Sequence, residues 1–375
     1  MIQPSSVTEL LQALVRIPSV NPHGDPGTDG IGEQQMAEYV ADFLGWIGAE
    51  VELREVLPGR PNVIGHWPAP GKPKLLFAPH CDTVSVAGMK IDPFGGDVHD
   101  GKVWGRGASD TKGSMASMLW ALRELRSQLG GLSHEIWFAG LVGEEAGQQG
   151  ARALAQQERF DFVIAGEPTN LDIVNRHKGC TQLRLIAKGH AAHAARLELG
   201  DNAIYKMADV ARYIRDVLTR ELSVHVDPVL GPSTVSLGTI SGGSKTNIVP
   251  DFCEATVDLR TVPEQENPGF LPHLYRRLQG ICPDLIIEAG QAPSLFTDPG
   301  HPLIGQLEAL GAKCVGAPWF CDAAIFASVG TPSIAMGPGS IAQAHTEDEW
   351  ITVADLERGA EFFAAFLGRL GEAGK

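Results

Sequence analysis

Apolar and polar positions follow two different periods along the first part of the chain. Residues 30–47 and 112–129 carry apolar side chains at the three- and four-residue spacing of amphipathic helices. Residues 75–81, 135–142 and 161–165 are short apolar runs flanked by polar residues or glycine, as is typical of buried strands. Strands that alternate with helices in this way predict an α/β core.

The pattern changes near residue 175 and returns near residue 290. Between these points the expected order is β-α-β-β-α-β, the ferredoxin-like plan. Its elements are a strand over 180–187, a helix over 202–218, strands over 234–240 and 253–259, a helix over 268–278 and a strand over 285–289. The α/β pattern then resumes with a helix over 301–310, a strand over 333–336 and a helix over 353–370.

This order predicts a smaller domain inserted into a larger one. We expect residues 1–176 and 289–375 to form the larger α/β domain and residues 177–288 to form the insertion. Residues 22–30 contain two prolines and three glycines, which predicts a surface loop.

A short polar motif ends the apolar run at residues 75–81. His80 and Asp82 are two positions apart, so a strand would place them on one face. Asp82 could then accept the free ring N–H of a metal-bound His80. A surface strand end would give the same triplet. Cys81 would point to the opposite face, so we interpret it as a core residue rather than as a nucleophile.

Three further segments supply carboxylates. Asp110 lies between a glycine-rich stretch and the helix predicted from residue 112, where it could cap the helix or bridge two metal ions with its two oxygens. Glu144 and Glu145 follow an apolar strand, at the end where open α/β sheets place their sites. Because adjacent side chains diverge, we assign Glu145 as a metal ligand and Glu144 as a general base. A solvated glutamate pair is the alternative.

Two more candidates complete the set. Glu167 ends the apolar run at 161–165, and His345 lies in a glycine- and proline-rich loop after residues 333–336. Oxygen and nitrogen donors without thiolates suit two divalent ions about 3.5–4 Å apart, with Zn²⁺ expected and Co²⁺ or Mn²⁺ as alternatives. The five candidate ligands are His80, Asp110, Glu145, Glu167 and His345.

Composition narrows the class of partner. The formal net charge of the 375 residues is −15, which opposes binding to nucleic acid or anionic membranes. No apolar run reaches the roughly 18 residues of a membrane span. Six cysteines occur without a CxxC pair, so neither a disulfide framework nor a thiolate zinc site is indicated. We expect a cytosolic protein with a small-molecule substrate.

These motifs, in this order, resemble the dinuclear zinc family that contains acetylornithine deacetylase, succinyl-diaminopimelate desuccinylase, aminoacylase and glutamate carboxypeptidase. The resemblance implies a metallo-exopeptidase-like catalytic domain with an inserted lid and dimerisation domain. It matches all five candidate ligands to the metal ligands, with Asp110 as the bridge. It also implies that Asp82 orients His80 and that Glu144 is the general acid/base.

The insertion carries segments that resemble substrate-contacting parts of the family. His193 matches a histidine that reaches across a homodimer to polarise the substrate carbonyl, although Ala194 and Ala195 replace the usual hydroxyl residues after it. Asn247 and Arg260 lie in segments that resemble those binding the substrate carboxylate. Arg260 could hold a carboxylate with both arms of its guanidinium or pair with Asp258.

The resemblance implies hydrolysis of the amide of an N-acyl amino acid, with N-acetylornithine or a close relative first and hence a role in arginine biosynthesis. Ala324 stands where desuccinylases place an arginine, which disfavours a succinyl substrate. A dipeptidase or carboxypeptidase would use the same chemistry on short peptides. The alternative from another class is a catalytically silent metal- or small-molecule-binding protein.

Overall fold

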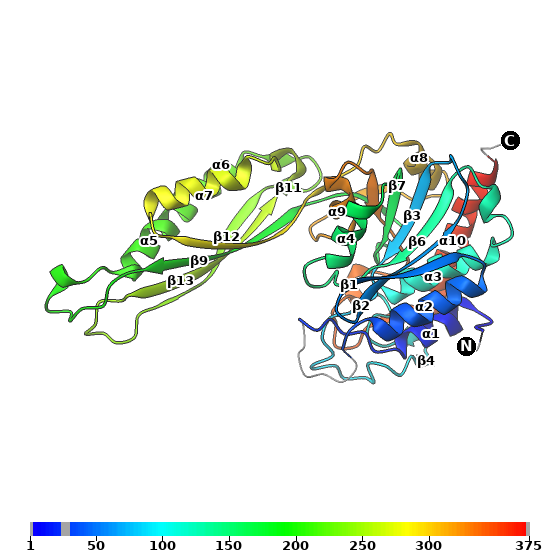
Figure 1. Ribbon diagram of the computed structural model, residues 1–375, viewed down its shortest axis with the longest axis horizontal. Coiled ribbons are helices and arrows are strands. Elements are labelled where there is room, and N and C mark those ends of the chain that lie inside the picture. Colours follow the sequence, from blue (N-terminus) through cyan, green and yellow to red (C-terminus); the bar gives the residue numbers. More distant parts are fainter. Residues whose placement is uncertain (1–2, 24–30, 373–375) are drawn as a thin grey trace. The chain divides into compact units, whose positions relative to one another are not determined.

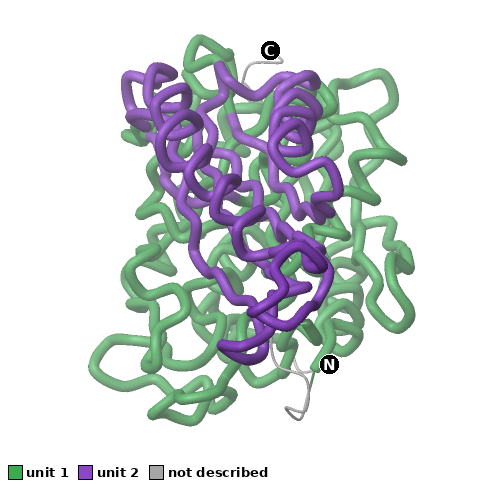
Figure 2. Tube along the Cα trace, turned by 90° about the vertical axis from the view of Figure 1, so that its left-hand side faces the viewer, with its two compact units in different colours: residues 1–175, 296–315, 321–375 green, residues 176–295, 316–320 purple. Residues whose placement is uncertain are grey.

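The computed structural model describes residues 3–23 and 31–372. Of the loop expected over 22–30, residues 24–30 lie outside the described part. The chain divides into two compact units (Figure 2). Unit 1 contains residues 1–175, 296–315 and 321–375, and unit 2 contains residues 176–295 and 316–320. The expected insertion, 177–288, falls within unit 2.

Unit 1 is built on a nine-stranded mixed sheet. Its strands, in order across the sheet, are β1 (Glu50–Leu57), β2 (Arg60–Trp67), β6 (Glu135–Gly140), β3 (Lys74–Pro79), β7 (Phe162–Gly166), β17 (Ser333–Ala335), β8 (Ile173–His177) and β15 (Leu295–Phe296), with β16 (Cys314–Ala317) paired to β8. Strands β6, β3, β7 and β17 run parallel, so their carboxyl ends lie along one edge.

Helices cover both faces of this sheet (Figure 1). One face packs against α1 (Val7–Val15), α2 (Gln34–Trp46), α3 (Lys112–Glu124), α8 (Pro302–Glu308) and α10 (Val353–Glu372), and the other packs against α4 (Gln149–Gln157) and α9 (Ala323–Ser328). Leu75 and Phe77 of β3 join the first core, and Leu76 joins the second. Burial on both faces explains why the parallel strands are continuous apolar runs. The α/β prediction is confirmed.

A small three-stranded sheet joins two distant segments of unit 1. Its strands are β4 (Val98–His99), β5 (Lys102–Trp104) and β18 (Trp350–Thr352). Trp350 pairs with Trp104, so the residues just after β5 lie beside the residues just before β18. Two short 3-10 turns, η1 (Leu129–Gly131) and η5 (Ile341–Gln343), complete the unit.

Unit 2 has the predicted β-α-β-β-α-β order. Its main elements are β9 (Gly179–Lys188), α5 (Ala203–Tyr213) continued by the π-helical turn η3 (Ile214–Leu218) and α6 (Thr219–Ser223), β12 (Thr234–Gly242), β13 (Phe252–Thr261), α7 (Phe270–Ile281) and β14 (Ile286–Ala292). The antiparallel sheet has the order β12-β13-β9-β14. Minor elements are η2 (Leu197–Leu199), β10 (Val226–Asp227), β11 (Gly231–Pro232) and η4 (Pro263–Gln265).

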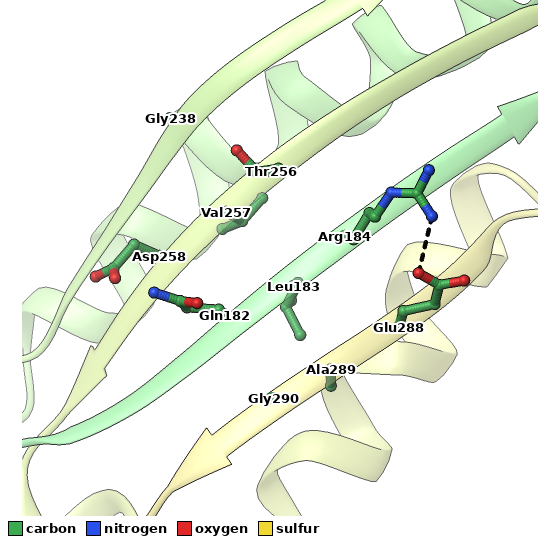
Figure 3. Close-up of a pocket in the computed structure, with 10 residues that line it drawn as sticks. All are labelled: Gln182, Leu183, Arg184, Gly238, Thr256, Val257, Asp258, Glu288, Ala289 and Gly290. Carbon is green, nitrogen blue, oxygen red and sulfur yellow. Dashed lines mark hydrogen bonds and ion pairs between the residues drawn. The ribbon is translucent and has the colours of Figure 1, made fainter. Parts of the chain in front are cut away.

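The two faces of the unit 2 sheet differ in character. Leu185 and Leu259 are buried in a core formed with the helices of this unit. The sheet also carries polar side chains, and Gln182, Arg184 and Thr256 are among those that line a hollow of about 510 Å³ (Figure 3). Arg184 beside this hollow pairs with Glu254 at 2.7 Å and Glu288 at 2.9 Å, so its charge is matched within the sheet. None of the predicted site residues is among the described residues that line this hollow.

The structure corrects several predicted bounds. The helix expected over 112–129 ends at Glu124, and the helix expected over 202–218 continues as far as Ser223. The strand expected over 75–81 ends at Pro79. Within the described ranges, none of the helices combines the length and apolar character that a membrane crossing requires.

Candidate metal centre

The candidate residues of unit 1 converge at the carboxyl edge of its parallel strands. His80 directly follows β3, and Glu167 directly follows β7. Glu144 and Glu145 lie in the loop after β6, and His345 lies in the loop after β17. Parallel pairing of these strands therefore brings together residues that are up to 265 positions apart.

The five predicted ligands form two groups that share one residue. His80, Asp110 and Glu167 make the first group, and in each group the ligand atoms lie within 4.8 Å of one another. The second group consists of Asp110, Glu145 and His345. Asp110 presents Oδ1 to Nε2 of His80 at 3.2 Å and Oδ2 to Nε2 of His345 at 3.4 Å. The two oxygens of Asp110 thus face different groups.

The distances within the groups fit those expected around a cation. Two ligand atoms about 2.0–2.2 Å from a tetrahedral ion stand roughly 3.3–3.6 Å from each other. Nε2 of His345 lies 3.3 Å from Oε2 of Glu145, and its distance of 3.4 Å to Asp110 is similar. The donor set of imidazole and carboxylate suits Zn²⁺ and related divalent ions.

The electrostatics of the groups also favour a cation. Burial raises the pKa of Glu144 and of Glu167 well above the usual range, and the charge of Glu167 raises that of Glu144 further. Hydrogen bonds with Asp110 and Glu145 raise the pKa of His345 to about 10. Burial opposes ionisation of Asp110, but hydrogen bonds from His345 and His80 outweigh it and lower the pKa. The cluster therefore has more carboxylates than positive groups to neutralise them.

Asp82 has a wider role in the local structure than the sequence indicated. His80 Nδ1 lies 2.9 Å from the main-chain carbonyl oxygen of Asp82 and 3.5 Å from its Oδ1, so the carbonyl is the nearer acceptor. The carboxylate of Asp82 accepts hydrogen bonds from Nδ2 of Asn21 and from the main-chain N–H groups of Glu144 and Glu145. It therefore fixes the loop that carries both glutamates.

The structure decides two alternatives for neighbouring residues. Thr111, not Asp110, is the N-cap residue of α3, so the interpretation of Asp110 as a helix cap is wrong. Cys81 is fully buried in the core, as predicted, and burial raises the pKa of its thiol. Glu145 joins a ligand group whereas Glu144 does not, so the adjacent side chains serve different positions.

The remaining predicted residues belong to unit 2. His193 is exposed and pairs through its backbone with Ile248, while Nδ1 of its ring accepts a hydrogen bond from the N–H of Ala195. The N–H of Ala194 donates to the carbonyl of Asn247, so the two predicted segments lie side by side. Arg260 makes a bidentate pair with Asp258 at 2.8 and 3.1 Å, which is the structural alternative considered for it.

The sequence patterns did not predict the roles of two buried residues near the metal-ligand groups. Asn21 binds Asp82 across 61 positions, and no motif pairs them. Glu349 is fully buried and accepts hydrogen bonds from the loop that carries Asp110. Its position four residues after His345, directly before an apolar strand, was the available signal.

Comparison with known proteins identifies the family of the chain. The model of peptidase family M20/M25/M40 matches residues 76–369. This match covers well over half of the chain, so the chain belongs to that family and is a metal-dependent hydrolase.

Individual relatives extend over nearly the whole chain. Acetylornithine deacetylase of Proteus mirabilis is 29% identical over 373 residues, covering 96% of this chain and 95% of its own length. An M20 family metallo-carboxypeptidase from Sulfolobus solfataricus has a TM-score of 0.77 at 19% identity, covering 98% and 100% of the two chains. Aminopeptidase PepT from Bacillus cereus has a TM-score of 0.75 at 22% identity, covering 97% and 98%. The solved structures share the fold.

The contacts of Asp82 predict the effect of Asp82→Asn. An asparagine offers one acceptor oxygen, so at least one of the three donors loses its partner, at a cost of about 1–3 kcal/mol in the free energy of unfolding. Hydrogen exchange of a peptide covering residues 141–148 should become faster, while a peptide from α10 keeps its wild-type rate. Unchanged exchange over residues 141–148 would show that Asp82 does not hold this loop.

Proposed function

We propose that the chain is a dinuclear metal-dependent amidohydrolase that removes the acyl group from an N-acyl amino acid, with N-acetylornithine or a close relative as substrate. The observation that carries the proposal is the division of the two oxygens of Asp110 between two ligand groups. The likeness to an acetylornithine deacetylase over nearly the full length of both chains supports the choice of substrate.

The proposed cofactor is a pair of divalent ions, zinc first and cobalt or manganese as alternatives. His80 and Glu167 would hold one ion, Glu145 and His345 would hold the other, and Asp110 would bridge them. Such ions make water more acidic and polarise a carbonyl. The contact between Nδ1 of His80 and the carbonyl of Asp82 places a proton on Nδ1, because a carbonyl can only accept. The neutral ring would then present Nε2 as a ligand atom in place of its hydrogen bond to Asp110.

Glu144 is the proposed general base and general acid. Its side chain is 8% exposed and belongs to neither ligand group, so it is free to act on water and substrate. It would take a proton from the attacking water and deliver it to the departing nitrogen, which leaves a carboxylate and a free amine. Burial and then the charge of Glu167 raise the pKa of Glu144, and a pair of cations beside it would oppose this shift and favour the ionised base.

The substrate assignment rests on fewer contacts. Ala324 is buried in α9 and presents no charged group, which is consistent with an acyl group that lacks a second carboxylate. Arg260 would release the carboxylate of Asp258 and bind the substrate carboxylate in its place. Asn247 would add a polar contact. Peptidases of the same fold make a dipeptidase or carboxypeptidase the second candidate function.

The assembly and location are part of the proposal. His193 would polarise the substrate carbonyl of a partner subunit, which requires a homodimer formed through unit 2. Its exposure on the surface of unit 2 allows this role. A cytosolic site of action would match the proposed part in arginine biosynthesis.

The two adjacent glutamates give a matched pair of variants. Glu144→Gln should lower kcat by about 10²–10⁴-fold because the proton carrier is lost, while the zinc content stays at the wild-type level. Glu145→Gln should instead release zinc from the second group. Turnover measured together with metal analysis separates the two effects. Near-normal turnover in Glu144→Gln would exclude it from the proposed role.

A substrate panel tests the proposed activity itself. Amine release by zinc- or cobalt-loaded protein should be fastest with N-acetylornithine, compared with other N-acetyl amino acids, N-succinyl-diaminopimelate and simple dipeptides. A preference for dipeptides would favour the second candidate function. Absence of turnover across the panel would contradict both.

Complementation between subunits tests His193. Chains carrying His193→Ala and chains carrying Glu144→Gln should each be nearly inactive, but their co-expression should restore about a quarter of wild-type activity through mixed dimers with one complete site. Light scattering should give the mass of a dimer. No recovery of activity in a preparation shown to contain mixed dimers would contradict the action of His193 across the dimer.

A further inference from the structure

Glu349 is a fully buried carboxylate that none of the proposed catalytic steps uses. It lies four residues after His345, directly before β18. Its Oε1 accepts hydrogen bonds from the main-chain N–H groups of Ser109 and Asp110, both at 2.9 Å. Its Oε2 accepts from the N–H of Gly107 at 3.0 Å and from Nη1 of Arg106 at 2.7 Å. Both oxygens are therefore fully engaged by one loop.

Residues 105–110 also bond to other segments, through the N–H of Arg106 to Pro93 and through Oγ of Ser109 to Ser340, but three of their main-chain N–H groups donate to Glu349. This loop belongs to no helix or strand, and Gly107 adopts a φ of 82°, which turns the chain. Ser109 and Asp110 are buried, so their N–H groups would each lose a hydrogen bond without Glu349. The carboxylate accordingly replaces the partners that regular secondary structure would supply.

The hydrogen bond between Glu349 and Asp110 holds the one residue that both ligand groups share. Asp110 must keep each of its oxygens within reach of a different histidine, at 3.2 Å from His80 and 3.4 Å from His345. Glu349 bonds to the N–H of Asp110 itself, and its own main-chain carbonyl accepts from the N–H of Gly105. It also lies on the segment that carries His345. One side chain thus connects the loop of the bridge with the segment of a second ligand.

We propose that Glu349 is a positioning residue for the bridging carboxylate. Its carboxylate bonds only to residues 106–110 among the described residues, and it acts by fixing where Asp110 presents its two oxygens. This inference rests on the proposed two-metal function, because only a shared Asp110 needs to be held between two ligand groups. A purely structural role would stabilise the fold without setting the affinity for metal.

The chain offers a matched control for that distinction. Asp227 in unit 2 is also a buried carboxylate that pairs with an arginine, and it accepts two main-chain hydrogen bonds where Glu349 accepts three. Its partners are the N–H groups of Val229 and Leu230, at 2.7 and 2.8 Å, and Nη1 of Arg176 at 3.0 Å. It is not part of either ligand group. Asp227→Asn therefore removes similar bonds without altering the proposed centre.

The experiment compares zinc affinity with stability in the full chain. Zinc binding is measured by competition with a chelator, and unfolding of the metal-free protein is measured in denaturant, for the wild type, Glu349→Gln, Glu349→Ala and Asp227→Asn. Glu349→Gln should bind zinc about 10–100-fold more weakly, as is usual when a partner of a metal ligand is lost. Glu349→Ala should bind still more weakly, and Asp227→Asn should keep wild-type affinity even where its stability falls.

Three results would overturn the inference. Glu349→Gln could bind zinc as tightly as the wild type, Asp227→Asn could lose as much affinity for an equal loss of stability, or both Glu349 variants could fail to fold. Asp110→Asn distinguishes these results from failure of the proposed function. If the wild type binds no zinc, or if Asp110→Asn binds it equally well, the two-metal function fails. If only Glu349→Gln is unaffected, the function stands and the positioning role fails.

Discussion

The balance of charge around Asp110 is the constraint on which the rest of the site depends. Several carboxylates are gathered at one buried edge of the sheet, where water cannot screen them and burial disfavours their ionised forms. Two imidazoles offset this charge in part through their contacts with Asp110. A pair of divalent ions would complete the balance and would explain why a fold keeps such a costly cluster in its interior.

Local hydrogen bonds then give the cluster its shape. Parallel strands bring the loops to one edge, but loops without regular structure need their own supports. Asp82 accepts main-chain bonds from the loop of Glu144 and Glu145, and Glu349 does the same for the loop of Asp110. Two buried carboxylates outside the ligand groups thus hold the segments that carry the ligands. In the proposed mechanism, this arrangement would leave Glu144 free to move protons while Glu145 holds an ion.

The main elements of both units and the candidate ligands could be predicted from the sequence because local patterns of apolar and polar residues encode them. Apolar runs such as residues 75–79 identify parallel strands, and polar residues directly after them must lie at the carboxyl edge of the sheet. The β-α-β-β-α-β order of unit 2 follows from the same patterns. The features that could not be predicted from the sequence depend on contacts between distant positions of the chain. Asn21 and Asp82 form a hydrogen bond, but no motif in the sequence links them. The β4-β5-β18 sheet joins short strands that are far apart in the sequence. The nearer acceptor of His80 is a main-chain carbonyl, which no side-chain pattern reveals.

Anomalous scattering from crystals of the zinc-loaded protein is the decisive measurement for the shared Asp110. Two peaks are expected in unit 1, one between His80, Asp110 and Glu167 and one between Asp110, Glu145 and His345, with one oxygen of Asp110 bound to each ion. A single peak, or two peaks of which only one contacts Asp110, would contradict the shared carboxylate and with it the proposed dinuclear centre.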